Sequence, residues 1–156
     1  MLHDRKETFG HYFEDFKAGD VFKHYPGKTV TESDNNLFCL LTMNHHPVHL
    51  DQEFCKSHQY GQILVVGTYV FSLVAGMSVA DISGKAYANL AYDKISHDGP
   101  VFIGDTLTAE TEVLSVKISE SNPDRGIVHI ETRAYNQRSE KVLTLRRHIL
   151  VPKRHD

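Results

Sequence analysis

Hydrophobic residues follow a helical period in the first half of the chain. The segment Thr31-Glu32-Ser33-Asp34 resembles a capping box, and the apolar residues after it recur at helical spacing, which predicts a helix over Glu32–Thr42. A second stretch, Thr68–Ala80, consists almost entirely of small and apolar residues and carries no charge. It predicts a helix that is apolar on all sides, and such a helix must be buried on most of its faces.

The second half of the chain changes to a period of two. Strand-like alternation predicts four long strands, Tyr87–Ile95, Thr106–Ile118, Gly126–Asn136 and Val142–Val151, with turn residues between them. A short opening strand is expected at Val21–Tyr25. One buried helix and a meander of long antiparallel strands pack best when the sheet curls around the helix, so the predicted class is α+β. This arrangement leaves an edge strand, and we therefore expect at least a homodimer.

Composition narrows the class of protein. A chain of 156 residues with 40% hydrophobic residues fits one domain over residues 1–156. The net charge is −3, and no basic block extends beyond Lys153-Arg154, so nucleic acid is not an expected partner. No apolar run reaches the length of a membrane span and the first residues lack a signal-peptide pattern, which predicts no membrane association and a cytoplasmic protein. Cys39 and Cys55 are interpreted as reduced core thiols.

Histidine is the unusual component, with eleven in the chain and three of them at His45, His46 and His49. They fall within Leu40–Asp51, which we expect to be a loop because Pro47 restricts the residue before it. A three-histidine metal site is the less favoured interpretation. Adjacent histidines in an extended segment point to opposite faces, and spacing places no further ligand, so no metal is expected.

The segment around Pro47-Val48-His49 resembles the MaoC-like, or (R)-specific enoyl-CoA hydratase, family, whose motif reads Gly-Asp-x-Asn-Pro-aliphatic-His. Aligned on these residues, the family's catalytic histidine falls on His49 and its catalytic aspartate falls on Asn44. Three further regions resemble family signatures: Tyr12–Asp20, Gly67 with Ser72, and Pro100–Leu107. The resemblance implies a single hot-dog domain. The asparagine variant of the motif also resembles the branch that acts on mesaconyl- or itaconyl-CoA, which implies a short branched or dicarboxylic acyl chain.

Hydration of an enoyl thioester needs a group that activates water, a group that handles the α-carbon proton, and donors that hold charge on the thioester oxygen. An imidazole works in either direction near neutral pH, so His49 is the expected acid/base. Asn44 cannot accept a proton, but its amide oxygen can orient the water. The backbone N–H of Gly67, at the start of the buried helix, is the expected donor to the enolate oxygen.

Other residues are candidates for supporting roles. We expect His46, Val66 and Thr68 to contact the substrate. Asp51 and Ser72 are possible supports, although a helix-capping role for Asp51 is equally natural. His97 is interpreted as a satisfied strand histidine, and Arg146, Arg147 and His148 as part of a charged edge strand. The expected reaction needs no cofactor, because coenzyme A enters as part of the acyl-CoA substrate.

Two alternatives stay open at this point. A hot-dog thioesterase often carries a carboxylate on or just before the central helix, and no acidic residue lies between Glu53 and Asp81, so thioester hydrolysis is the less favoured reaction. The second alternative is a non-catalytic acyl-CoA-binding protein, in which the replacement of aspartate by Asn44 has abolished the chemistry.

Overall fold

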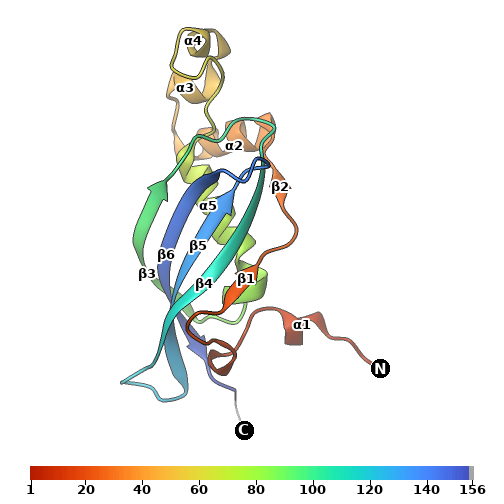
Figure 1. The fold of residues 1–156 in the computed structure, drawn as a ribbon, viewed down its shortest axis with the longest axis vertical. Helices are drawn as coiled ribbons and strands as arrows, with labels where there is room; N and C mark the ends of the chain where they lie inside the picture. Colours follow the sequence, from red (N-terminus) through yellow and green to blue (C-terminus); the bar gives the residue numbers. More distant parts are fainter. Residues whose placement is uncertain (155–156) are drawn as a thin grey trace.

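The computed structural model describes residues 1–154 and is built on one antiparallel sheet (Figure 1). The strands run in the order β1-β4-β5-β6-β3, and β2 pairs with β4 outside this path. Their bounds are β1 Val21–Lys23, β2 Lys28–Thr29, β3 Ala88–His97, β4 Thr106–Ile118, β5 Arg125–Tyr135 and β6 Lys141–Pro152. The predicted α+β class and the four long strands are confirmed, and the opening strand is two residues shorter than predicted.

The inner face of the sheet carries the core. Alternate residues of β5 and β6, among them Val128, Ile130, Leu145 and Ile149, are fully buried. The intervening residues point to the outer face, because side chains of a strand alternate between its two sides.

Helix α2 (Glu32–Thr42) has the bounds that the sequence predicts. The Thr31 hydroxyl accepts a hydrogen bond from the backbone N–H of Asp34 at 3.2 Å, and the Asp34 carboxylate accepts one from the N–H of Thr31 at 3.0 Å. This capping box satisfies two of the N–H groups that a helix start leaves unpaired. The helix ends at Met43, whose φ of 60° places it in the left-handed region.

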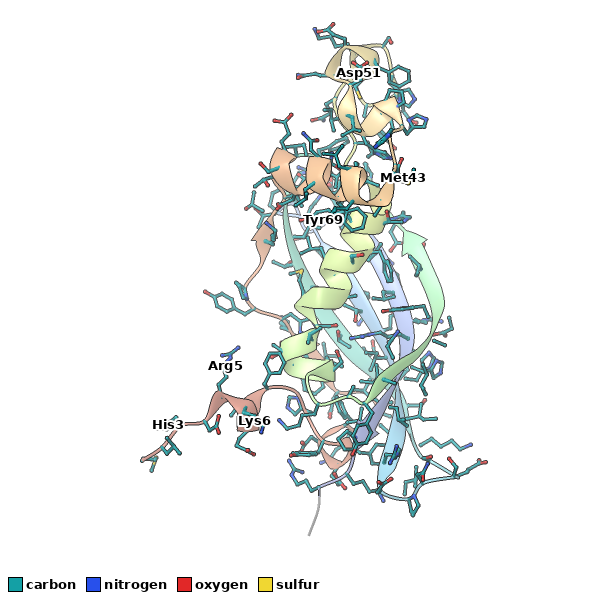
Figure 2. All side chains as sticks on the ribbon, turned by 180° about the vertical axis from the view of Figure 1, so that it is seen from behind. His3, Arg5, Lys6, Met43, Asp51 and Tyr69 are labelled. Carbon is teal, nitrogen blue, oxygen red and sulfur yellow. The ribbon has the colours of Figure 1, made fainter. Side chains whose placement is uncertain are left out.

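Helix α5 (Gly67–Met77) lies on the inner face of the sheet (Figure 2), with Val70 and Val74 in the core. Burial on most of its faces is confirmed, because all but three of its residues are buried or half-buried and its partly buried apolar side chains pack against the core. The exposed positions recur every four residues, at Thr68, Ser72 and Gly76. The helix also ends earlier than predicted, since the backbone continues as a π-helical turn, η2 (Val79–Ser83).

The expected loop between the two long helices is partly helical. Helices α3 (Pro47–Leu50) and α4 (Gln52–Lys56) project from one end of the molecule (Figure 1). The prediction is wrong here because Pro47 occupies the first position of α3, where proline is favoured since its missing N–H would have no helical partner.

Two short segments, α1 (Arg5–Thr8) and η1 (Phe13–Asp15), precede the sheet and lie near its opposite end (Figure 1). Among the helices of residues 1–154, none combines the length and apolar character that a bilayer crossing requires.

Candidate active site

A cavity of about 620 Å³ opens where the segment before α3, the start of α5 and the end of β3 meet. Its lining includes five residues that the sequence selects: Asn44, His49, Val66, Gly67 and Thr68. Residues from separate parts of the chain therefore converge on one space, as the proposed hydration chemistry requires.

The imidazole of His49 is held in a defined orientation. Its Nδ1 lies 2.7 Å from the backbone carbonyl oxygen of Leu64. A carbonyl oxygen only accepts hydrogen bonds, so Nδ1 carries the proton of the neutral ring and Nε2 is left with a lone pair. Because His49 lines the cavity, this arrangement suits Nε2 to the role of a proton acceptor.

Asn35 connects the histidine to the start of α5. This side chain is fully buried on α2, where its Nδ2 donates to the carbonyl oxygen of His49 at 2.9 Å and its Oδ1 accepts from the N–H of Val66 at 2.9 Å. One amide thus fixes the backbone of the candidate acid/base relative to the helix start. Its signal in the sequence is a polar residue on the buried side of an amphipathic helix.

The start of α5 offers backbone donors to the cavity. Val66 is the N-cap, and within the described chain no side chain caps this helix. The N–H groups of Tyr69 and Val70 both bond to the carbonyl of Val66. The first N–H groups of a helix have no acceptor within it, and Gly67 and Thr68 line the cavity, so their N–H groups are the candidate donors to a ligand there.

Gly67 also meets a side chain that sequence reasoning leaves out of the site. A Cβ at this position would lie 2.7 Å from Cε1 of His97, so a larger residue would require the imidazole to move. His97 ends β3 and lines the cavity, although we expected an ordinary strand histidine. Nothing local in the sequence reveals this contact, because it joins residues 30 positions apart.

Asp98 brings a carboxylate to the cavity that the sequence analysis does not identify. Its Oδ2 accepts a hydrogen bond from the hydroxyl of Thr144 at 2.5 Å, and its Oδ1 accepts one from the hydroxyl of Ser96 at 3.0 Å. The cavity therefore contains an acidic side chain even though position 44 does not supply one.

Asn44 follows the left-handed residue Met43, which Figure 2 shows at the end of α2. Its backbone N–H donates to the carbonyl of Cys39 at 3.0 Å, which fixes the turn. Its Oδ1 accepts a long hydrogen bond, 3.4 Å, from the N–H of His46. The amide thus retains most of its capacity to bind a water molecule in the cavity.

Three selected residues lie outside the cavity lining. His46 is the N-cap of α3, where its Nδ1 accepts from the N–H of Val48 at 3.1 Å. Asp51 is the N-cap of α4, where its Oδ1 accepts from the N–H of Phe54 at 3.0 Å, and Figure 2 shows it on the projecting helices. Ser72 is exposed on α5. The first two position the backbone around His49, and the capping alternative for Asp51 matches its geometry.

Tyr69 marks the contact between α2 and α5 (Figure 2), where its ring packs edge-on against Phe38 at 5.7 Å between centroids. Burial, with a smaller contribution from the charge of Asp34, raises the pKa of Tyr69 to about 12. Its hydroxyl therefore stays protonated at neutral pH and does not compete with His49 as a base.

Comparison with known proteins decides the family. A sequence profile of the mesaconyl-CoA hydratase family matches residues 1–156. The chain belongs to the mesaconyl-CoA hydratase family. The mesaconyl-CoA hydratase of Cereibacter sphaeroides is 36% identical over 149 residues, which make up 96% of this chain and 43% of that protein. The family resemblance seen in the sequence is thus confirmed, and the chain spans less than half the length of this relative.

Solved structures of similar proteins share the fold of this chain. A putative MaoC domain protein dehydratase from Chloroflexus aurantiacus superposes with a TM-score of 0.89 at 31% identity, over 94% of this chain and 41% of that one. A Mycobacterium tuberculosis protein described as a double hot-dog fold superposes with a TM-score of 0.86 at 24% identity, over 94% and 46%. The hot-dog fold predicted for this chain is confirmed.

Proposed function

We propose that this chain catalyses the reversible hydration of an enoyl-CoA thioester to the 3-hydroxyacyl-CoA, as a hydro-lyase. The observation that carries the proposal is the position of His49, whose Nδ1 is fixed by the Leu64 carbonyl and whose ring lines the same cavity as the uncapped start of α5. A base and an oxyanion donor therefore share one space, as addition of water to a conjugated thioester requires.

The proposed reaction begins when Nε2 of His49 takes a proton from water as the water oxygen bonds to C3 of the enoyl group. The C2–C3 π electrons move toward the thioester oxygen, and the N–H of Gly67 donates to the resulting enolate. Asn44 orients the water through its amide oxygen. The enolate then collapses, and C2 takes the proton back from the imidazolium of His49, which restores the neutral ring.

We further propose a short branched or dicarboxylic acyl chain, because the family profile is that of mesaconyl-CoA hydratase. The reaction as written uses only side chains, backbone and the coenzyme A of the substrate, and independence from any cofactor stays a prediction. A cytoplasmic location likewise stays a prediction.

We also propose that the chain works as a homodimer or larger homo-oligomer that pairs along β3. This strand ends the sheet, and it and the residue before it expose Tyr87 (52%), Leu90 (48%), Tyr92 (43%) and Ile95 (45%). An exposed apolar edge strand is a template for pairing with another chain. Light scattering is expected to give the mass of a dimer or more, and Tyr92→Lys is expected to shift the mass toward the monomer.

A non-catalytic acyl-CoA-binding protein is the second candidate, and the amide of Asn44 in place of a carboxylate favours it. Thioester hydrolysis is a third outcome, and the carboxylate of Asp98 in the cavity is the observation that keeps it in the test.

The test is a panel of crotonyl-, mesaconyl- and itaconyl-CoA, with the conjugated-thioester absorbance and free thiol followed together. Loss of absorbance without thiol release supports hydration, and thiol release supports a thioesterase. Binding of the thioesters without turnover, combined with activity that appears in Asn44→Asp, supports the binding protein.

A further inference from the structure

A second cluster of chemically active side chains lies on the outer face of the sheet, opposite α5. Asp93 from β3, His129 from β5 and His148 from β6 bring one oxygen and two imidazole nitrogens within 4.8 Å of one another. Because the neighbours Val128 and Ile149 point into the core, His129 and His148 project from the other side.

The geometry of the cluster is specific. Nε2 of His129 lies 3.0 Å from Oδ2 of Asp93, and Nδ1 of His148 lies 3.6 Å from Oδ1 of the same carboxylate. The two imidazoles stack with their centroids 3.9 Å apart and their planes 4° apart. They occupy directly opposite positions in the pairing of β5 with β6, which keeps their nitrogens on the same side.

A β-bulge directs Asp93 toward the histidines. The pairing of β3 with β6 slips between Tyr92 and Lys94, so Asp93 is the extra residue of the edge strand. A bulge re-aims a side chain that regular alternation would place elsewhere. The carboxylate therefore reaches across β6 to His129 on the next strand.

The surroundings allow a cation to enter. The side chains of His129, His148 and Asp93 are 21%, 35% and 38% exposed, so solvent reaches the cluster. Arg146, two residues before His148 on the same face, is bound by Glu131 at 2.5 Å, which offsets its charge. Partial burial is the largest single influence on the pKa of Asp93 and acts to raise it, but the hydrogen bonds to the carboxylate, first that from His129, and the nearby imidazoles together outweigh burial and lower the pKa.

We propose that Asp93, His129 and His148 form a binding site for a divalent transition-metal ion such as Zn²⁺, with water completing the coordination. Imidazole nitrogen and carboxylate oxygen are ligands that Zn²⁺, Ni²⁺ and Cu²⁺ accept. A bound ion must lie in the plane of each ring, so the stacked imidazoles rotate apart until their lone pairs converge on it.

The site is separate from the cavity of His49. His97, on the same strand as Asp93, pairs with the buried Leu143, whereas the bulge sends Asp93 to the outer face. The ion would connect the exposed strand β3 to β5 across β6. Its expected role is to hold the edge strand in place, because an ion that binds only the native state raises its stability.

The test is calorimetric titration of the untagged, chelator-treated chain with Zn²⁺. We expect one ion per chain, and a loss of affinity of at least about tenfold in His129→Ala, His148→Ala and the conservative Asp93→Asn. His58→Ala, which removes an exposed histidine two residues after the end of α4, is the matched control and is expected to bind as the wild type does. Melting temperature without metal shows that each variant is folded.

A second readout locates the ion. Zn²⁺ is expected to shift the imidazole ¹⁵N resonances of His129 and His148 and to raise the melting temperature of the wild type but not of Asp93→Asn. The proposal is overturned if Zn²⁺ does not bind, or if Asp93→Asn and His148→Ala bind it as tightly as the wild type.

Discussion

The two ends of α5 each place a histidine among polar groups, but only one end forms a candidate site. Near the start of the helix, His49 uses Nδ1 on a backbone carbonyl and lines a cavity. Beyond its other end, His24 uses both nitrogens, with Nδ1 2.8 Å from the Asp81 carboxylate and Nε2 2.7 Å from the Thr111 hydroxyl.

The residues around His24 resemble a catalytic site in composition, because hydroxyl, imidazole and carboxylate are the components of a nucleophilic triad. Its environment argues against that interpretation. His24 is 6% exposed, and the Thr111 hydroxyl is buried and bonded to that of Thr132 at 2.7 Å. The difference teaches that a histidine is suited to acid/base catalysis when it keeps a free nitrogen beside a cavity. A histidine with both nitrogens bonded in the core stabilises the fold.

The largest effect is expected from His24→Ala, which tests the structural side of this comparison. Removing the buried ring deletes two hydrogen bonds and opens a cavity, so the free energy of unfolding should fall by about 2–4 kcal/mol. Urea unfolding measures the loss, and the kcat of the folded fraction should stay within about twofold of wild type. A folded His24→Ala protein with greatly reduced kcat would contradict the purely structural role of His24.

Asn35→Ala should instead lower the rate of the reaction at the His49 end of α5. It removes the two hydrogen bonds that fix the backbone of His49 relative to Val66, and misplacement by about 1 Å can reduce a rate about 100-fold. We expect kcat for enoyl-CoA hydration to fall by about 10- to 100-fold. The matched control is Asn36→Ala, the next residue of α2, which is expected to keep its rate; equal losses in both variants would argue against the role of Asn35.

Gly67→Ala tests the close contact between Gly67 and the imidazole of His97. The added Cβ would lie 2.7 Å from that ring, and overpacking of this kind costs about 1–3 kcal/mol. Adding His97→Ala should recover most of the lost stability, because it removes the side chain that the Cβ meets. Thermal unfolding of both single variants and the double variant gives the coupling, and simple additivity would mean that the two residues do not touch.

The smallest effect concerns the ion pair that supports α2. Lys28, at 2.8 Å, and the N–H of Thr31 lower the pKa of Asp34 from 3.8 to about 2. Because the folded-state pKa is depressed, this stabilisation is present above pH 3.8 and is lost as the pH falls toward about 2. Asp34→Asn should cost about 0.5 kcal/mol at pH 7, since both partners are partly exposed. The difference in free energy of unfolding between the wild type and Asp34→Asn, measured by urea unfolding, should disappear near pH 2. A difference independent of pH would mean that the Asp34 carboxylate is not its cause.

Local patterns in the sequence predict the elements well, because their signals lie within a few residues. The capping box at Thr31 gives the start of α2, and strict alternation gives the bounds of β4. The sequence misses α3, because Pro47 is compatible with both a loop and the first turn of a helix. It also places the end of α5 too late, since small and apolar residues continue from the helix into the π-helical turn η2.

The candidate site is predictable only in part. The family motif identifies His49 and Asn44, the start of the apolar helix identifies Gly67, and the structure brings all three to one cavity. His97 and Asp98 come from the far side of the fold, and no local spacing connects them to the motif. Contacts of this kind depend on the register of β3 in the sheet, which hydrophobic periodicity leaves open.

The central claim is that His49 transfers the protons of a hydration reaction. The most direct test is the initial rate of hydration of the best enoyl-CoA substrate by His49→Ala and by the wild type, with thioester affinity and melting temperature measured on the same samples. We predict a rate at least about 100-fold lower, with affinity and melting temperature close to wild type. A folded His49→Ala protein that hydrates the thioester within twofold of the wild-type rate would contradict the claim.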